Sequence, residues 1–159
     1  MAERVPTIAL DFDGVIHKYS AGWGDGTIYD PPMEGAFESI SELLLTYNVV
    51  VITARSDLPS VAAWFQVHDA DFTIVRVWEH EKFWNGLYEG AERQTHVVGL
   101  TNRKLPADIY LDDRGVRFDS WKTALNDIRF YLRDETHGEA MKRRVNVSNE
   151  SISESQPEA

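Results

Sequence analysis

The feature that most constrains the fold of this chain is an alternation of short apolar runs with segments of helical periodicity. The runs at 7–11, 49–53 and 109–112 are rich in Ile, Leu and Val, and helical patterns occupy 35–47 and 119–132. A parallel strand pair needs a long crossover, usually a helix, so this alternation is typical of a parallel sheet covered by helices. The sequence therefore predicts an α/β fold with a parallel central sheet.

The two helical patterns and a third helix after Asp57 give apolar faces that can cover this sheet. Asp57 is placed to cap a helix with Pro59 in its first turn. The apolar faces are expected to contain Phe37, Ile40, Leu43, Leu44 and Tyr47, then Val61, Trp64 and Phe65, then Trp121, Leu125, Ile128 and Leu132. Residues 72–78 and 96–100 both read as strands, and the pattern leaves open which of them is central. Residues 78–90 could hold a short helix.

Composition narrows the class of protein. The 159 residues contain no cysteine, which excludes disulfides and thiolate metal sites, and no apolar run is long enough to cross a bilayer. We expect a cytoplasmic protein with one domain over 1–142 and a disordered, Ser-rich tail over 143–159. The net charge of -10 argues against electrostatic binding of nucleic acid over a broad surface, although it leaves a local cationic pocket possible.

Polar residues follow three of the predicted strands. Asp11 and Asp13 come after the first, Thr53 after the second, and Asp112-Asp113 after 109–111. In open α/β sheets the carboxyl ends of the strands form the edge where ligands bind. Carboxylates, a threonine and a lysine converging there predict a site for a hard divalent cation and a phosphate, since Mg²⁺ prefers oxygen ligands. Lys104 lies just before the last of these strands.

Four motifs in chain order carry a resemblance to a known family. Asp11-Phe12-Asp13-Gly14, Ile52-Thr53-Ala54-Arg55, Lys104 and Asp112-Asp113 resemble the motifs of haloacid-dehalogenase-like phosphohydrolases, particularly the small capless members, some of them phage-encoded. The resemblance covers about 7–121. It implies a three-layer α/β/α Rossmann-like fold without a large cap, a mobile flap over 16–32 and an insertion at the rim over about 72–94.

The resemblance also implies a role for each motif residue. Asp11 would be the nucleophile that forms an aspartyl-phosphate, and Asp13 would be the acid and base. Phe12, between them, would point into the fold. Mg²⁺ would be held by Asp11, the Asp13 backbone carbonyl and Asp112, with Asp113 as an alternative or supporting ligand. Thr53 and the backbone at Ala54 would bind the phosphoryl group, and Lys104 would offset its charge.

The substrate is less constrained than the chemistry. A small phosphorylated compound is expected, a nucleotide among the candidates, with Trp23, Arg55 and Arg114 as substrate contacts. Trp23 stands out because it lies in the glycine-rich stretch "SAGWGDG", where its ring could stack on a base or simply pack. Without a cap, water could be excluded by the flap, by a neighbouring subunit or by a large substrate.

Alternative functions follow from the same residues. The chain could be a nucleotidase or a nucleic-acid end phosphatase of the same mechanism, or a non-catalytic phosphate- or nucleotide-binding regulator. A response-regulator receiver also uses aspartates, threonine and lysine, but there the acidic pair comes first along the chain, whereas here Asp112-Asp113 comes last.

Overall fold

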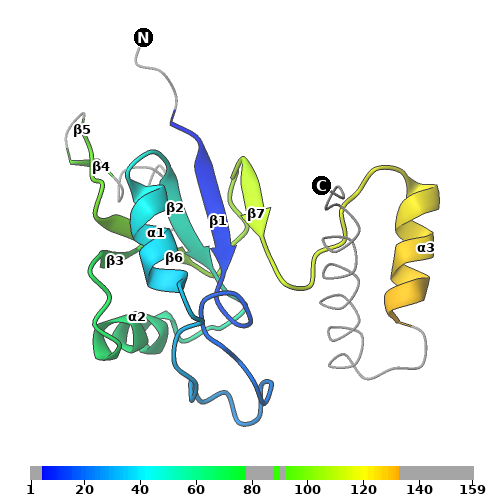
Figure 1. Cartoon of the computed structure of the whole chain (residues 1–159), viewed down its shortest axis with the longest axis horizontal. Helices are drawn as coiled ribbons and strands as arrows, with labels where there is room; N and C mark the ends of the chain where they lie inside the picture. Colours follow the sequence, from blue (N-terminus) through cyan, green and yellow to red (C-terminus); the bar gives the residue numbers. More distant parts are fainter. Residues whose placement is uncertain (1–4, 78–87, 90–91, 133–159) are drawn as a thin grey trace, which may run out of the picture. The chain divides into compact units, whose positions relative to one another are not determined.

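The computed structural model describes residues 5–77, 88–89 and 92–132. The chain divides into two compact units, Met1–Asp113 and Arg114–Ala159 (Figure 1). The single domain expected over 1–142 stays a prediction, and the tail over 143–159 lies outside the described residues.

The first unit contains a five-stranded parallel sheet, which confirms the predicted α/β class. Its strands are β1 (Thr7–Asp11), β2 (Asn48–Ile52), β3 (Thr73–Arg76), β6 (Val97–Thr101) and β7 (Ile109–Leu111). Their order is β3-β6-β2-β1-β7, and every neighbouring pair is parallel. The sequence pattern did not show whether 72–78 or 96–100 forms the central strand. In the structure β6, within the second range, is interior, and β3, within the first, is an edge strand.

A two-stranded antiparallel sheet, formed by β4 (Tyr88–Glu89) and β5 (Glu92–Arg93), lies in the chain between β3 and β6. The short helix considered over 78–90 falls mostly on residues outside the described part, and its end at 88–89 is strand instead. Residues 73–76 of the expected rim insertion belong to the main sheet.

Helices α1 (Ala36–Leu44) and α2 (Leu58–Val67) pack on one face of the sheet. Alternate strand residues supply that face, because side chains of a strand point to opposite sides in turn. The shared core contains Ile8, Leu10, Val49, Val51, Val98 and Leu100 from the strands, with Ile40, Leu44, Val61, Trp64 and Phe65 from the helices. The intervening residue Val50 belongs to a second, smaller cluster with Val97 and Leu105.

Two local predictions in this unit are confirmed. Phe12 is fully buried, and its ring centroid lies 5.0 Å from that of Trp64 and 5.7 Å from that of Phe65. Asp57 caps α2, since its Oδ1 accepts a hydrogen bond from the backbone N–H of Ser60 at 3.1 Å. Phe12 therefore anchors the segment between the two carboxylates in the core.

The second unit contains α3 (Trp121–Tyr131), as the pattern over 119–132 predicts. The residues of its expected apolar face are exposed instead of buried: Trp121, Leu125, Ile128 and Leu132. Ser120 caps it, because its Oγ accepts a hydrogen bond from the N–H of Thr123 at 3.2 Å. The three-layer arrangement of helices and sheet stays a prediction.

Among the described helices, none combines the length and the hydropathy needed to span a bilayer.

Candidate functional site

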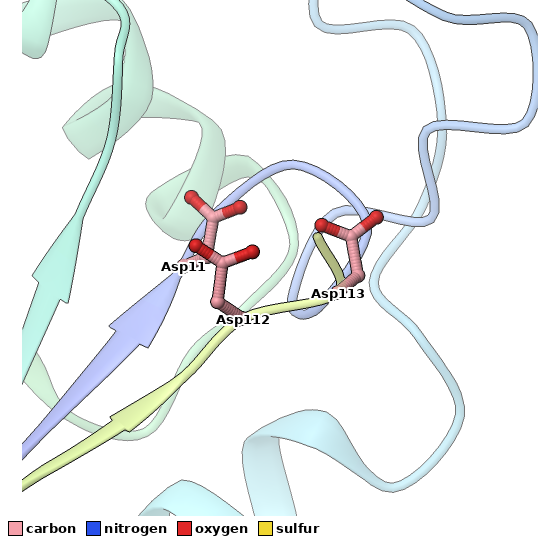
Figure 2. A group of neighbouring side chains, drawn as sticks. All are labelled: Asp11, Asp112 and Asp113. Carbon is pink, nitrogen blue, oxygen red and sulfur yellow. The ribbon is translucent and has the colours of Figure 1, made fainter. Parts of the chain in front are cut away.

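Three carboxylates converge at the carboxyl edge of the sheet. Asp11 ends β1, and Asp112 and Asp113 follow β7, as Figure 2 shows. The strands are parallel neighbours with Leu10 opposite Leu111, so the residues after them reach the same edge. One ligand oxygen from each of the three lies within 4.8 Å of the others. This arrangement brings together residues that are about a hundred positions apart in the chain.

The environment of Asp11 disfavours its charged form. Burial is the main cause that raises the pKa of Asp11 to about 6, and the negative charges of Asp112, Asp113 and Asp13 raise it further. A hydrogen bond from the Phe12 N–H to Asp11 Oδ1, 2.8 Å long, acts in the opposite direction. Carboxylates held this close repel one another unless one is protonated or a cation lies between them, and an all-oxygen donor set fits a hard ion such as Mg²⁺.

Gly14 makes the turn that lets this cluster form. Its φ is +89°, and a Cβ added at this position would collide with Oδ2 of Asp113. The backbone folds back here, because the N–H groups of Ile16 and His17 donate to the carbonyl of Phe12 at 3.0 and 2.8 Å. Only glycine combines this backbone conformation with room for the Asp113 carboxylate.

Replacing Gly14 by alanine is therefore expected to displace Asp113. The variant should bind a divalent cation at least about tenfold more weakly and unfold with a loss of at least ~1 kcal/mol, because a positive φ strains alanine. Calorimetric titration with Mg²⁺ and urea denaturation measure the two effects. Gly22→Ala is the matched control: its φ is +75°, but nothing lies within 4 Å of the added Cβ. Equal cation binding in both variants would contradict the assigned role of Gly14.

The carboxylate of Asp13 has different neighbours from those of the cluster. It accepts hydrogen bonds from Arg55 Nε at 2.8 Å and Arg55 Nη2 at 2.9 Å, and its Oδ1 lies 2.8 Å from His17 Nδ1. The N–H of Asp30 donates to His17 Nε2 at 3.1 Å, so Nδ1 carries the imidazole proton and donates to Asp13. Asp13 is thus held by a bidentate arginine and a buried histidine, while its role as acid and base stays a prediction.

Thr53 and Thr101 form a pair of matching turns at the ends of β2 and β6. Thr53 Oγ1 accepts a hydrogen bond from the Arg55 N–H at 3.1 Å, and Thr101 Oγ1 accepts one from the Arg103 N–H at 3.2 Å. The Thr53 N–H donates to the Thr101 carbonyl at 3.1 Å. Both side chains are buried, and each hydroxyl keeps its own hydrogen for donation. Thr101 was missed from the sequence, although it ends its strand as Thr53 does.

Three other predicted site residues lie outside the cluster of three carboxylates. Ala54 is exposed directly after Thr53. Lys104 is exposed, and its Nζ lies 5.9 Å from the ring centroid of Tyr110. Within the described part of the chain, no ion pair joins Lys104 to the three carboxylates. Arg114 begins the second unit. The roles expected for these residues stay predictions.

The loop over 16–32 has a shape set by its own side chains. Asp30 Oδ2 accepts a hydrogen bond from the Ser20 N–H at 2.6 Å. Tyr29 Oη accepts one from the Ala21 N–H and donates one to the Gly22 carbonyl, both at 2.8 Å. These contacts were missed from the sequence, where the glycines suggest a backbone without a fixed shape. The mobility expected of this flap stays a prediction.

Arg55 links this loop to Asp13. Its Nη1 donates to the carbonyl of Gly26, and its Cζ lies 4.7 Å from the centroid of the Trp23 ring. Trp23 remains half-exposed. The guanidinium therefore connects the loop to Asp13. Two of its five N–H groups take no part in these bonds, so they remain able to donate to a substrate, and the substrate contact expected of Arg55 stays a prediction.

Comparison of the chain with protein-family models, with curated proteins and with solved structures finds no match. The resemblance to haloacid-dehalogenase-like phosphohydrolases therefore rests on the four motifs alone.

Proposed function

We propose that this protein is a Mg²⁺-dependent phosphohydrolase of the haloacid-dehalogenase type that cleaves phosphate monoesters through an aspartyl-phosphate on Asp11. The observation that supports this most strongly is the convergence of Asp11, Asp112 and Asp113 within 4.8 Å, with the buried Thr53 directly after Ile52, the residue paired with Asp11 on the neighbouring strand. A nucleophile, a cation site and a phosphoryl-binding hydroxyl at one sheet edge are what phosphoryl transfer needs.

The proposed reaction has two displacements at phosphorus. A carboxylate oxygen of Asp11 attacks phosphorus, the bond from phosphorus to the ester oxygen breaks, and protonated Asp13 gives its proton to the leaving oxygen. Water then attacks the same phosphorus and loses a proton to Asp13, and the bond to Asp11 breaks. The sum is ester plus water giving alcohol plus phosphate.

The remaining residues stabilise charge during these steps. Asp11, Asp112, Asp113 and the Asp13 carbonyl would hold Mg²⁺, which, when bound, offsets the negative charge on the phosphoryl oxygens. Thr53 would donate a hydrogen bond to one of these oxygens, and Lys104 would add a positive charge. Arg55 and His17 would orient Asp13 toward the leaving group, since both contact its carboxylate.

Assays with a panel of phosphate monoesters test this proposal. We expect hydrolysis in Mg²⁺ that stops with a chelator and returns when Mg²⁺ is added in excess. Phosphate or nucleotide binding without release of inorganic phosphate from any ester would favour the alternative of a non-catalytic regulator. A nucleotidase or an end phosphatase would be recognised by preference for nucleotides or for terminal phosphates on oligonucleotides.

Replacing Mg²⁺ by Ca²⁺ is expected to inhibit turnover by at least about tenfold. Ca²⁺ takes more oxygen ligands at longer distances, so it would engage both oxygens of Asp11 and leave none for attack. Rates measured at equal, saturating concentrations of the two ions check this, with Mn²⁺ as a control ion of smaller coordination number. Full activity in Ca²⁺ would contradict a carboxylate shared between the cation and the phosphorus.

A further inference from the structure

A cavity of about 510 Å³ lies between the loop around Trp23 and helix α2. Its lining includes Trp23, Thr27, Arg55, Asp57, Ala63 and His68. The volume is within the range of cavities that hold ligands of a few hundred daltons. All of the lining residues belong to the first unit, so the cavity is built by one compact part of the chain.

Arg55 places this cavity beside the proposed catalytic edge. Its side chain lines the cavity and also binds the Asp13 carboxylate through Nε and Nη2. Thr53, two residues earlier, directly follows β2, the strand next to β1. A phosphate ester bound at Asp11 could therefore extend its alcohol portion past Asp13 into the cavity.

The chemistry of the lining favours a planar group without negative charge. Trp23 offers a half-exposed indole, and His68 adds a second ring, 4.7 Å from that of Trp64. Asp57 contributes a carboxylate whose pKa is lowered by hydrogen bonds from Ser60, so it is ionised at neutral pH. Among the lining residues Arg55 is the one arginine or lysine, and it is already paired with Asp13. A second phosphate would be repelled there.

We propose that this cavity binds the base of a nucleoside monophosphate, a proposal that rests on the proposed phosphohydrolase function. The base would stack on the Trp23 ring, and the carboxylate and hydroxyl groups of the lining would accept hydrogen bonds from an exocyclic amine such as that of adenine. Because the lining contains the ionised Asp57 and its one cation, Arg55, is already paired with Asp13, a nucleoside with one phosphate fits better than a dinucleotide or an oligonucleotide.

Binding of adenosine to the full-length chain tests this proposal without requiring catalysis. Adenosine carries the base and no phosphate, so isothermal calorimetry should detect binding to the wild type, whereas ribose should not bind. Trp23→Ala should weaken adenosine binding by about tenfold, and Trp23→Phe should keep most of it, since a phenyl ring still stacks.

A second pair of variants separates the cavity from effects on the loop. Ala63 and Gln66 are both exposed on α2, but only Ala63 lines the cavity. Ala63→Leu should fill part of the cavity and weaken adenosine binding by about tenfold or more, whereas Gln66→Leu, which adds the same side chain outside it, should have no effect. Both substitutions place a good helix former on a helix surface.

The outcomes distinguish this proposal from the proposed function. Absence of adenosine binding, or equal binding by wild type, Trp23→Ala and Ala63→Leu, would overturn the base-binding cavity even if small phosphate esters are hydrolysed. Adenosine binding that follows the expected order would support the cavity even if no ester is hydrolysed. In that second case the phosphohydrolase proposal would fail while the binding site stands.

Discussion

Replacing Asp11 by asparagine is expected to lower kcat by at least about 10⁴-fold while the chain stays folded. Asparagine has nearly the same shape, and its side-chain oxygen can still accept the hydrogen bond that Asp11 Oδ1 accepts from the Phe12 N–H at 2.8 Å. The amide cannot act as an anionic nucleophile, so no acyl phosphate can form. Initial rates with a reactive aryl phosphate and circular dichroism spectra measure the two halves of this prediction.

The stability of this variant provides an internal check. Asp11 lies among Asp112, Asp113 and Asp13, whose charges disfavour its own. In the presence of a chelator, Asp11→Asn should therefore unfold at a temperature equal to or above that of the wild type. Asp119→Asn, which alters an exposed carboxylate in the second unit, is the control for a general effect of losing one charge. Wild-type turnover by Asp11→Asn would overturn the mechanism.

Replacing Arg55 by methionine is expected to reduce the free energy of unfolding by about 3 kcal/mol. The side chain of Arg55 is only 5% exposed and that of Asp13 only 15%, so the substitution leaves a largely buried carboxylate without its bidentate partner. The contacts of Arg55 with Gly26 and Trp23 are lost as well. Urea denaturation of the two proteins measures the difference.

Arg117→Met is the matched control for this substitution. Arg117 also pairs with an aspartate, Asp119, at 3.5 Å, but the two side chains are 90% and 61% exposed. Exposed pairs contribute little, so the control should lose less than about 1 kcal/mol. A double-mutant cycle with Asp13→Asn should show that Arg55→Met costs less once the carboxylate is gone. Equal losses of unfolding free energy in Arg55→Met and Arg117→Met would show that the Arg55–Asp13 pair does not stabilise the loop.

The parallel sheet could be predicted because each interior strand is a continuous apolar run. Thr7–Asp11 and Asn48–Ile52 are buried on both faces, which gives β-branched and aliphatic runs instead of an alternating pattern. The choice between β3 (TIVR) and β6 (VVGLT) was left open, since both are short runs with β-branched residues, a composition that suits an edge strand as well as an interior one. What distinguishes β6 is that all five of its residues are buried, and burial depends on which strands lie beside it.

The acidic cluster was accessible from sequence for a similar reason, because Asp11 and Asp112 each follow an apolar strand directly. The contacts of Asp13 with its partners could not be predicted from the sequence. Arg55 is 42 positions away, and its contact with Asp13 depends on the parallel pairing of β1 and β2. His17 follows Asp13 by four residues, a spacing that the turn at Gly14 converts into a 2.8 Å contact. Both contacts come from the tertiary arrangement of the chain.

In the proposed mechanism, Asp11 carries the phosphoryl group during turnover. The most direct measurement is to quench a single turnover with acid at several times, reduce the protein with borohydride and map the peptides by mass spectrometry. Borohydride converts an aspartyl-phosphate into homoserine and leaves free carboxylates unchanged. We predict homoserine at position 11 in samples that contain substrate and Mg²⁺, and aspartate there when substrate is omitted. Homoserine at another aspartate, or phosphate release with unmodified Asp11 at every time, would contradict it.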